Sequence, residues 1–298
     1  MDRMNISVVI PTLNAGSELD SLLTALEKQT VPPSEILVMD SASEDDTVSV
    51  AGRHSQVRVH GIDRKDFSHG GTRDKAFSLV SGEIVVFMTQ DTVPASDLLL
   101  ERLTAPLKEA GTVSAYARQL PKSSASAREK LVRAFNYPGK SERHTEANLP
   151  ERGIKTFFLS DVCSAYRRKE YMELGGFERD VMTNEDMFFA ARAIRAGYTI
   201  AYAADAEVYH SHDFSLREQY RRNRLQGYEI ERHKELLENA SSSKEGIAML
   251  KQVTGQLLKQ GRIFSVFGLA ADCGARYLGS RAGRKDYLKK QQAGAEKA

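Results

Sequence analysis

The chain has 298 residues, of which 41% are hydrophobic and 28% are charged, with a formal net charge of +2. These values are typical of a folded globular protein and exclude an intrinsically disordered chain. Cys163 and Cys273 stand far apart in the sequence, which disfavours a disulfide framework and a zinc site. No signal peptide precedes the first strand-like segment, and no apolar stretch reaches the roughly 20 residues that a transmembrane helix needs. We therefore expect a cytoplasmic protein.

The first ninety or so residues alternate strand-like and helix-like segments. Short apolar runs predict four strands, at residues 6–10, 35–39, 57–60 and 84–87. Pro11 should end the first strand, and Ser17 with Asp20 predicts a capping box for the helix that follows. The apolar face of that helix is formed by Leu19, Leu22, Leu23 and Leu26. This alternation indicates an α/β protein with a mainly parallel sheet and helices on both faces.

Polar side chains follow three of these strands at the points where the strands end. Thr12, Asp40 and Asp91 come from separate stretches of the sequence. Because the carboxyl ends of parallel strands meet at one edge of a sheet, and ligands bind there, we expect a ligand site at this edge. Helix capping is the alternative for each acid taken singly.

Two adjacent glycines, Gly70 and Gly71, stand just before a predicted helix. Glycines in this place allow close approach of the backbone to a ligand. Arg73 lies in the first turn of that helix, where the helix dipole disfavours a cation, so it predicts an anionic partner. A flexible glycine turn with Arg73 in solvent is the alternative.

The next hundred or so residues predict a leucine-rich helix opened by Pro94 and Ser96, a strand at 113–120 and a helix at 125–135. The segment 138–150 is predicted to be a loop, as part of a polar insertion above the sheet. Such loops often contact a substrate, and a mobile loop is the alternative.

Two acids, Glu185 and Asp186, head a further helix whose core-facing residues would be Phe188, Ala191 and Ile194. Acids at a helix N-terminus stabilise the helix, and a catalytic base would occupy the same place. Both interpretations stay open on this pattern alone.

After a strand at residues 198–202, His210 and His212 form an alternating pair. Such a pair ligates a metal or a phosphate in some proteins, and a partly buried structural histidine is the alternative. From Leu216 the sequence becomes helical and rich in arginine.

Together these segments resemble the inverting glycosyltransferases of family 2, which have the GT-A fold, over about residues 6–228. The matching pieces are residues 8–14 and 38–41 at the first two strands, Thr89-Gln90-Asp91 as the metal motif and Asn184-Glu185-Asp186 as the base motif. The resemblance implies a GT-A catalytic domain at residues 1–230 and a helical, basic tail at residues 231–298. Within the domain, residues 1–120 would bind the nucleotide sugar and residues 121–230 would hold the acceptor and the base.

The resemblance also implies a single displacement at an anomeric carbon, with Asp186 as the general base and Glu185 as the alternative base. Asp91 and His212 would hold a Mg²⁺ or Mn²⁺ ion at the donor phosphates, and Arg73 would face the pyrophosphate. The other donor-binding residues that it implies are Pro11, Thr12, Asn14, Asp40, Ser41, His69 and Gln90.

Residues 67–73 and the Thr-Gln-Asp form of the metal motif are most similar to bacterial rhamnosyltransferases that use dTDP-L-rhamnose. Residues 262–267 and 277–279 of the tail share this similarity. Many family members carry Asp-x-Asp in the metal motif, whereas this chain has Thr89 and Gln90 ahead of a lone Asp91.

Residues 244–298 hold eleven Lys and Arg against four Asp and Glu, a balance of +7 that leaves −5 for residues 1–243. Apolar residues repeat at helical spacing between these charges: Leu250, Val253, Leu257, Leu258, Ile263, Phe264 and Phe267. A basic amphipathic helix predicts peripheral contact with the inner face of the plasma membrane, where a lipid-linked acceptor would lie. Packing on the catalytic domain or in a homodimer interface is the alternative.

The predicted function is transfer of L-rhamnose from dTDP-L-rhamnose to a lipid-linked or saccharide acceptor, with inversion, in the synthesis of a bacterial cell-surface polysaccharide. A glycosyltransferase that uses a UDP-sugar donor and a nucleotide-sugar-binding protein without turnover are the alternatives. A membrane- or nucleic-acid-associated scaffold that depends on the basic tail is a third hypothesis. We expect no nucleic acid among the partners of the leading hypothesis.

Overall fold

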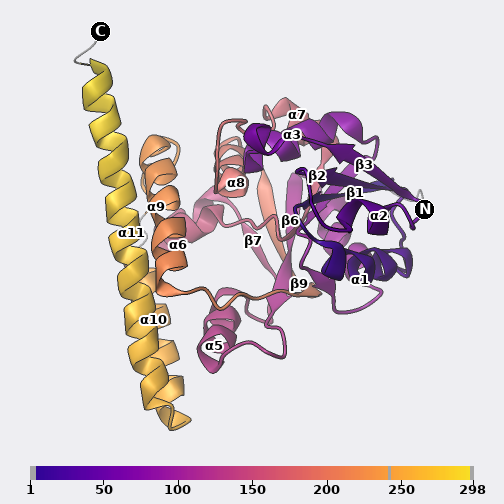
Figure 1. Ribbon diagram of the computed structural model, residues 1–298. Coiled ribbons are helices and arrows are strands. Elements are labelled where there is room, and N and C mark those ends of the chain that lie inside the picture. Colours follow the sequence, from indigo (N-terminus) through magenta and orange to yellow (C-terminus); the bar gives the residue numbers. More distant parts are fainter. Residues whose placement is uncertain (1–4, 241–242, 296–298) are drawn as a thin grey trace.

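The computed structural model describes residues 5–240 and 243–295, which contain one central sheet (Figure 1). Its strands are β1 (Ile6–Thr12), β2 (Glu35–Asp40), β3 (Val57–Gly61), β4 (Ile84–Met88), β5 (Val93–Pro94), β6 (Thr112–Leu120), β7 (Glu142–His144), β8 (Cys163–Arg167) and β9 (Thr199–Tyr209). Their order is β3-β2-β1-β4-β8-β6-β9-β5, with β7 paired to β9. Helices cover both faces of the sheet, which confirms the α/β architecture expected from the sequence (Figure 1).

The helices of the described residues are α1 (Gly16–Glu27), α2 (Thr47–Ala51), α3 (His69–Leu79), α4 (Leu99–Thr104), α5 (Ala127–Asn136), α6 (Leu149–Arg152), α7 (Arg168–Glu173), α8 (Glu185–Arg195), α9 (Leu216–Arg232), α10 (Ser243–Lys259) and α11 (Ile263–Ala295). Short 3-10 helices lie at Arg64–Asp66, Ala105–Lys108, Glu146–Asn148 and Gly153–Phe157.

The first half of the sheet is parallel. β1 pairs with β2 and β4, and β2 pairs with β3, all in parallel register. Thr12 at the end of β1 stands beside Asp40 at the end of β2, and Asp91 follows β4 at the same edge. The predicted convergence of these three strand ends is confirmed, because parallel neighbours must end on the same side of a sheet.

The second half of the sheet is mixed. β8 runs antiparallel to both β4 and β6, so β6 and its parallel neighbour β9 end at the same edge as β4. The loops after β6 and β9 therefore reach the edge where Asp91 lies. The sequence analysis gave no strand at β8, whose five residues carry too short an apolar run to be recognised.

Several local predictions were wrong. β1 continues through Pro11 to Thr12, because the fixed φ of proline suits an extended strand and only one N–H is lost. α1 has Ala15 at its N-cap without a side-chain cap, so Ser17 and Asp20 form no capping box. Pro94 belongs to β5, and the leucine-rich helix begins later, at α4. The predicted loop at residues 138–150 contains β7, which extends the sheet beside β9 and does not lie above it.

The sheet separates two apolar cores. One contains the four leucines of α1, all fully buried as predicted, together with alternate residues of β1, β2 and β4. The other is rich in aromatic rings from α3, β4, β8, α7 and α8, and within it Phe77 stacks on Tyr171 with the ring centroids 3.6 Å apart. Phe188, Ala191 and Ile194 of α8 are buried in this second core, as predicted, and they fix the start of α8 against the sheet.

The C-terminal helices pack on the rest of the chain. α11 lies along α9 (Figure 1), and the two backbones approach each other closely at glycines from both helices. A Cβ atom at Gly283 would lie 1.8 Å from the carbonyl oxygen of Arg224, and one at Gly279 would lie 2.4 Å from that of Tyr220. The helical tail is confirmed, and α11 shows the predicted alternative of packing on the catalytic domain. In the described part of the chain, no helix is both long enough and apolar enough to cross a membrane.

We predict that Gly283→Ala separates α11 from α9 and lowers the free energy of unfolding by about 1–3 kcal/mol, because the added methyl group overlaps a backbone oxygen. Gly274→Ala is the matched control on the same helix, since nothing lies within 4 Å of its Cβ position. The control should raise stability by about 0.5–1 kcal/mol through helix propensity. Chemical denaturation and hydrogen exchange of α11 measure both effects. Equal stability of the two variants would contradict the close helix contact.

Candidate active site

Three side chains that could hold a metal ion converge at the edge where β4 and β9 end. His210 Nε2 lies 3.3 Å and His212 Nε2 lies 2.9 Å from Oδ2 of Asp91. The ligand atoms of the three residues lie within 4.8 Å of one another. The structure thus adds His210 to the pair Asp91 and His212 that the sequence predicted.

The hydrogen bonds of His210 determine which of its ring nitrogens faces Asp91. Its Nδ1 lies 3.2 Å from Oε1 of Gln119, an oxygen that also accepts a hydrogen bond from Arg133. Because that oxygen can only accept, Nδ1 must carry the proton, and the lone pair of Nε2 faces the carboxylate of Asp91. Burial lowers the pKa of His210, against the opposing effect of Asp91. Two lone pairs that face each other repel, and a cation bound between them would relieve this repulsion, so these residues fit a metal ion.

The ends of β1 and β2 form a second part of the site. The Thr12 hydroxyl donates to Oδ1 of Asp40 at 3.1 Å, and Ser43 donates to both oxygens of Asp40 through its hydroxyl and its N–H. Asp40 therefore holds the following loop against β1. Ser41 is buried, and its hydroxyl has no hydrogen-bond partner among the residues that the structure describes, which leaves it for a ligand.

Two polar side chains tie the loops at this edge together. Gln90 accepts the N–H of Leu13 at 2.8 Å and donates to its carbonyl oxygen at 3.2 Å. The side chain of Asn14 accepts the N–H of Glu44 at 2.9 Å. In this structure Gln90 and Asn14 thus position the loops after β1, β2 and β4, and Pro11 lies within β1 just before them.

Three residues in the loops around the site adopt left-handed backbone conformations: Asn14 with φ 52°, Ala42 with φ 57° and Asn184 with φ 65°. Asparagine tolerates this conformation, whereas alanine is strained in it. Strained residues persist only where the surrounding structure fixes them, and they cluster at functional sites. Ala42 directly follows Ser41, so the strain lies beside the free hydroxyl.

Arg73 has its anionic partners inside the protein. Its Nη1 donates to Oε1 of Glu185 at 2.8 Å, and its Nε lies 3.3 Å from Oδ2 of Asp161. All three side chains are buried. His69 also touches this guanidinium, with Nδ1 3.1 Å from Nη1, and burial and the charge of Arg73 lower its pKa to about 3, so His69 is neutral.

The two predicted acids of α8 play different structural parts. Glu185 points to Arg73, whereas Asp186 accepts the N–H of Asp161 at 3.1 Å and that of Met187 at 2.8 Å and is only partly buried. Burial, together with the charges of Glu185 and Asp161, raises the pKa of Asp186. Burial raises the pKa of Glu185 to about 7, against the opposing effect of Arg73. Because Glu185 is buried in its ion pair with Arg73 whereas Asp186 is partly exposed, Asp186 is the stronger candidate for the base.

Some residues of the site were missed by the sequence analysis. Asp161 accepts hydrogen bonds from Ser164 at 2.6 Å and from Tyr166 at 2.5 Å, and Gln119 orients His210. Asp161 and Gln119 lie in segments without a recognisable motif. The glycines Gly70 and Gly71 approach the carbonyl oxygens of Glu178 and Arg179, so their close contact is with the chain itself.

Comparisons with known proteins agree with this geometry. A profile described as "Glycosyl transferase family 2" matches residues 7–175, more than half of the chain. The chain belongs to glycosyl transferase family 2. It is 39% identical to the O-antigen chain rhamnosyltransferase RfbN of Salmonella typhimurium over 220 residues, which cover 74% of this chain and 70% of RfbN. The identity to the O-antigen chain rhamnosyltransferase WbaN of Salmonella anatum is 37%, over 73% and 70% of the two chains.

A solved structure shows the fold of this family 2 glycosyltransferase. The mannosyltransferase PcManGT from Pyrobaculum calidifontis, in complex with GDP-Man and Mn²⁺, aligns with a TM-score of 0.64 and 18% identity, over 97% of this chain and 88% of that one. The GT-A fold expected from the sequence is confirmed. The sequence predicted a divalent metal, and the structure contains a possible site for one at Asp91, His210 and His212.

We predict that Arg73→Met lowers the free energy of unfolding by about 3–5 kcal/mol, because it leaves buried carboxylates without their cation. Arg179→Met is the control: Arg179 pairs with Asp74 but is 83% exposed, and such pairs contribute at most about 1 kcal/mol. Urea denaturation measures both variants. A stable Arg73→Met variant that has lost only donor binding would show that Arg73 acts on the donor.

Proposed function

We propose that this family 2 glycosyltransferase moves L-rhamnose from dTDP-L-rhamnose to a lipid-linked or saccharide acceptor, with inversion, during synthesis of a bacterial surface polysaccharide. The similarity to RfbN, an O-antigen chain rhamnosyltransferase, carries the proposal, because it spans 74% of this chain. The family profile, which matches residues 7–175, covers the stretches that hold Asp40 and Asp91. The acceptor would then be a growing glycan.

The metal proposed for the cluster of Asp91, His210 and His212 is Mn²⁺. Mg²⁺ prefers an all-oxygen ligand set, whereas imidazole nitrogens are ligands of transition metals. The structure of PcManGT, which aligns with this chain, was solved in complex with GDP-Man and Mn²⁺. When bound, such an ion would stabilise the charge that gathers on the leaving diphosphate. The metal motif of this chain, Thr89-Gln90-Asp91, contains one acid, and His210 and His212 would supply the other protein ligands.

Asp186 is the proposed general base. Its two oxygens already accept backbone N–H groups, which fix the carboxylate at the head of α8 while it stays partly open. It would take the proton of the acceptor hydroxyl as the new glycosidic bond forms. Glu185 is a poorer candidate, because its carboxylate is buried against Arg73 and cannot reach a ligand without breaking that ion pair.

The alternative is a glycosyltransferase with another nucleotide-sugar donor. TarS from S. aureus, which aligns with a TM-score of 0.55 and 20% identity, was solved with UDP-GlcNAc, and PcManGT was solved with GDP-Man. These likenesses concern the fold and leave the donor open. The sequence similarity to rhamnosyltransferases favours the rhamnosyl donor.

We predict that dTDP-L-rhamnose with Mn²⁺ raises the melting temperature more than UDP-glucose, UDP-GlcNAc or GDP-mannose does. A ligand at 100 times its Kd stabilises the native state by about 2.7 kcal/mol, which a thermal-shift panel resolves. His212→Ala, measured in parallel, should lose the metal-dependent part of the shift. A larger shift with a UDP-sugar would contradict the rhamnosyl donor, and no shift with any nucleotide sugar would contradict the donor site.

We further predict that Asp186→Asn lowers the transfer rate by about 10²–10⁴-fold, because the amide cannot accept the proton. Donor affinity should stay near that of the parent. Asp180→Asn is the control, since Asp180 is an exposed acid nearby whose ion pair with Arg232 contributes little. Transfer by Asp186→Asn at more than half the parent rate would place the base elsewhere.

Membrane contact is proposed for the turn between α10 and α11. The apolar stripe predicted for the tail divides in the structure: Val253 and Leu257 are buried against α5, whereas Phe264 is 91% exposed and Phe267 is 68% exposed. Leu258 and Ile263 are also exposed there. Lys259 and Arg262 stand beside them in the sequence. Exposed aromatic rings next to cations favour the interface of an anionic membrane, and a lipid-linked acceptor would lie there.

We predict that the double variant Phe264→Ser, Phe267→Ser abolishes co-sedimentation with vesicles that contain phosphatidylglycerol, because burial of each ring contributes on the order of 1.5–3 kcal/mol. Met172→Ser, an exposed apolar residue on α7, is the control and should not change binding. Failure of the parent protein to bind such vesicles at low salt would contradict membrane contact.

A further inference from the structure

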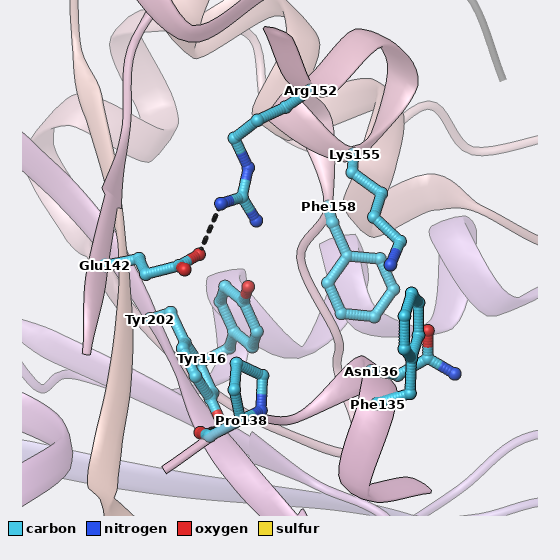
Figure 2. A pocket seen from close by; sticks show the side chains of 9 residues that line it. All are labelled: Tyr116, Phe135, Asn136, Pro138, Glu142, Arg152, Lys155, Phe158 and Tyr202. Atoms are coloured by element: carbon cyan, nitrogen blue, oxygen red, sulfur yellow. Dashed lines mark hydrogen bonds and ion pairs between the residues drawn. The ribbon is translucent and has the colours of Figure 1, made fainter. Parts of the chain in front are cut away.

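A pocket of about 160 Å³ lies apart from the residues assigned above (Figure 2). Tyr116 of β6, Tyr202 of β9 and Phe158 are among the residues that line it, and in Figure 2 Arg152 of α6 lies at the top and Glu142 of β7 at the left. Ligand pockets for drug-sized molecules enclose roughly 300–1,000 Å³, so this space is too small for a nucleotide sugar. It suits a single ring or one unit of a longer ligand.

The aromatic rings at the pocket pack against one another, and of Tyr116, Tyr202 and Phe158 only Phe158 is partly exposed. Tyr116 stacks on Tyr202 with ring centroids 5.0 Å apart and an interplanar angle of 29°, and Phe158 meets Tyr116 edge-on at 5.5 Å. Tyr202 is held in place because its hydroxyl donates to the carbonyl oxygen of Pro138 at 2.8 Å. A saccharide ring has C–H faces that pack against aromatic rings, whose faces carry partial negative charge.

The polar groups of the pocket complement hydroxyl groups. Arg152 Nη1 pairs with Glu142 Oε2 at 2.6 Å, and Lys155 also lines the pocket, so its side chains present several donors together with a carboxylate acceptor. The Nε–H of Arg152 is buried and has no hydrogen-bond partner within the described ranges. A hydroxyl group both donates and accepts, so the hydroxyl groups of a sugar suit this mixed set of donors and acceptors.

The pocket lies close to the proposed base. Phe158 lines the pocket, and only three residues further along the chain Asp161 donates its N–H to Asp186. Three residues span at most about 11 Å. Tyr137, whose ring packs on Phe158 and Tyr202, separates the two places. A ligand in the pocket would therefore neighbour the acceptor hydroxyl without occupying its place.

We propose that this pocket binds a sugar ring of the acceptor glycan, remote from the ring that receives the new sugar. The inference rests on the proposed glycosyltransferase function and adds a second saccharide-binding site to it. Phe158, which is partly exposed, packs on a C–H face of the sugar ring and is backed by the buried rings of Tyr116 and Tyr202. Arg152, Glu142 and Lys155 bind its hydroxyl groups.

The test is saturation-transfer NMR with the methyl glycosides of L-rhamnose, D-mannose, D-galactose and D-glucose, in the presence of saturating dTDP and Mn²⁺. With the donor site occupied, a remaining signal reports a second site. We expect at least one glycoside to bind, and Asn136→Trp, which fills the pocket, to weaken that binding at least about tenfold. Arg143→Ala is the control, because Arg143 lies on β7 beside Glu142 but points to Glu109 and Thr112.

A second variant, Arg152→Gln, keeps the test valid if the tryptophan variant does not fold. In transfer to lipid-linked acceptor in isolated membranes, either folded variant should raise the KM for acceptor and leave kcat unchanged. Binding of no glycoside, or equal binding by parent and pocket variants, would overturn the second site. Failure of the nucleotide sugars to bind would instead contradict the proposed function, and the thermal-shift panel reports that separately.

Discussion

The buried ion pairs of Arg73 join three elements of the fold that lie far apart in the sequence. The guanidinium comes from α3, beside the donor-side strands, while Glu185 heads α8 and Asp161 precedes β8. A buried charge is stable only when it is paired, so the three elements must keep their relative positions. The same carboxylates raise the pKa of Asp186, which connects the folding of this centre to the proton affinity of the proposed base.

Gln119 extends this connection to the metal cluster. Its amide oxygen fixes the tautomer of His210, and its amide nitrogen donates to the hydroxyl of Ser160 at 2.9 Å. Ser160 precedes Asp161, whose N–H binds Asp186. One series of hydrogen bonds thus positions both His210 of the metal cluster and Asp186, the proposed base. Sugar transfer develops charge at the leaving diphosphate and at the acceptor hydroxyl, so groups at both places must be held in position.

The sequence predicted what local patterns determine. The strands β1, β2 and β4, the buried leucines of α1 and the strand-end acids follow from periodicity and from parallel topology. The partners of Arg73 were not predictable, because Glu185 lies 112 residues away and an ion pair leaves no periodic signal. β8 was missed because Ser164 interrupts its apolar run, and the proposed saccharide pocket because its lining comes from separate segments of the chain. His210 carried a usable signal, since it shares the alternating spacing of His212 at the end of β9.

The central claim is that the ends of β4 and β9 hold a divalent metal opposite a base on α8. The most direct measurement is a crystal structure with dTDP and Mn²⁺, with anomalous diffraction recorded at the manganese edge. The account predicts one anomalous peak in contact with Asp91 Oδ2 and the Nε2 atoms of His210 and His212, and Asp186 facing the open side of the site. A manganese peak away from these three residues, or none with dTDP bound, would contradict it.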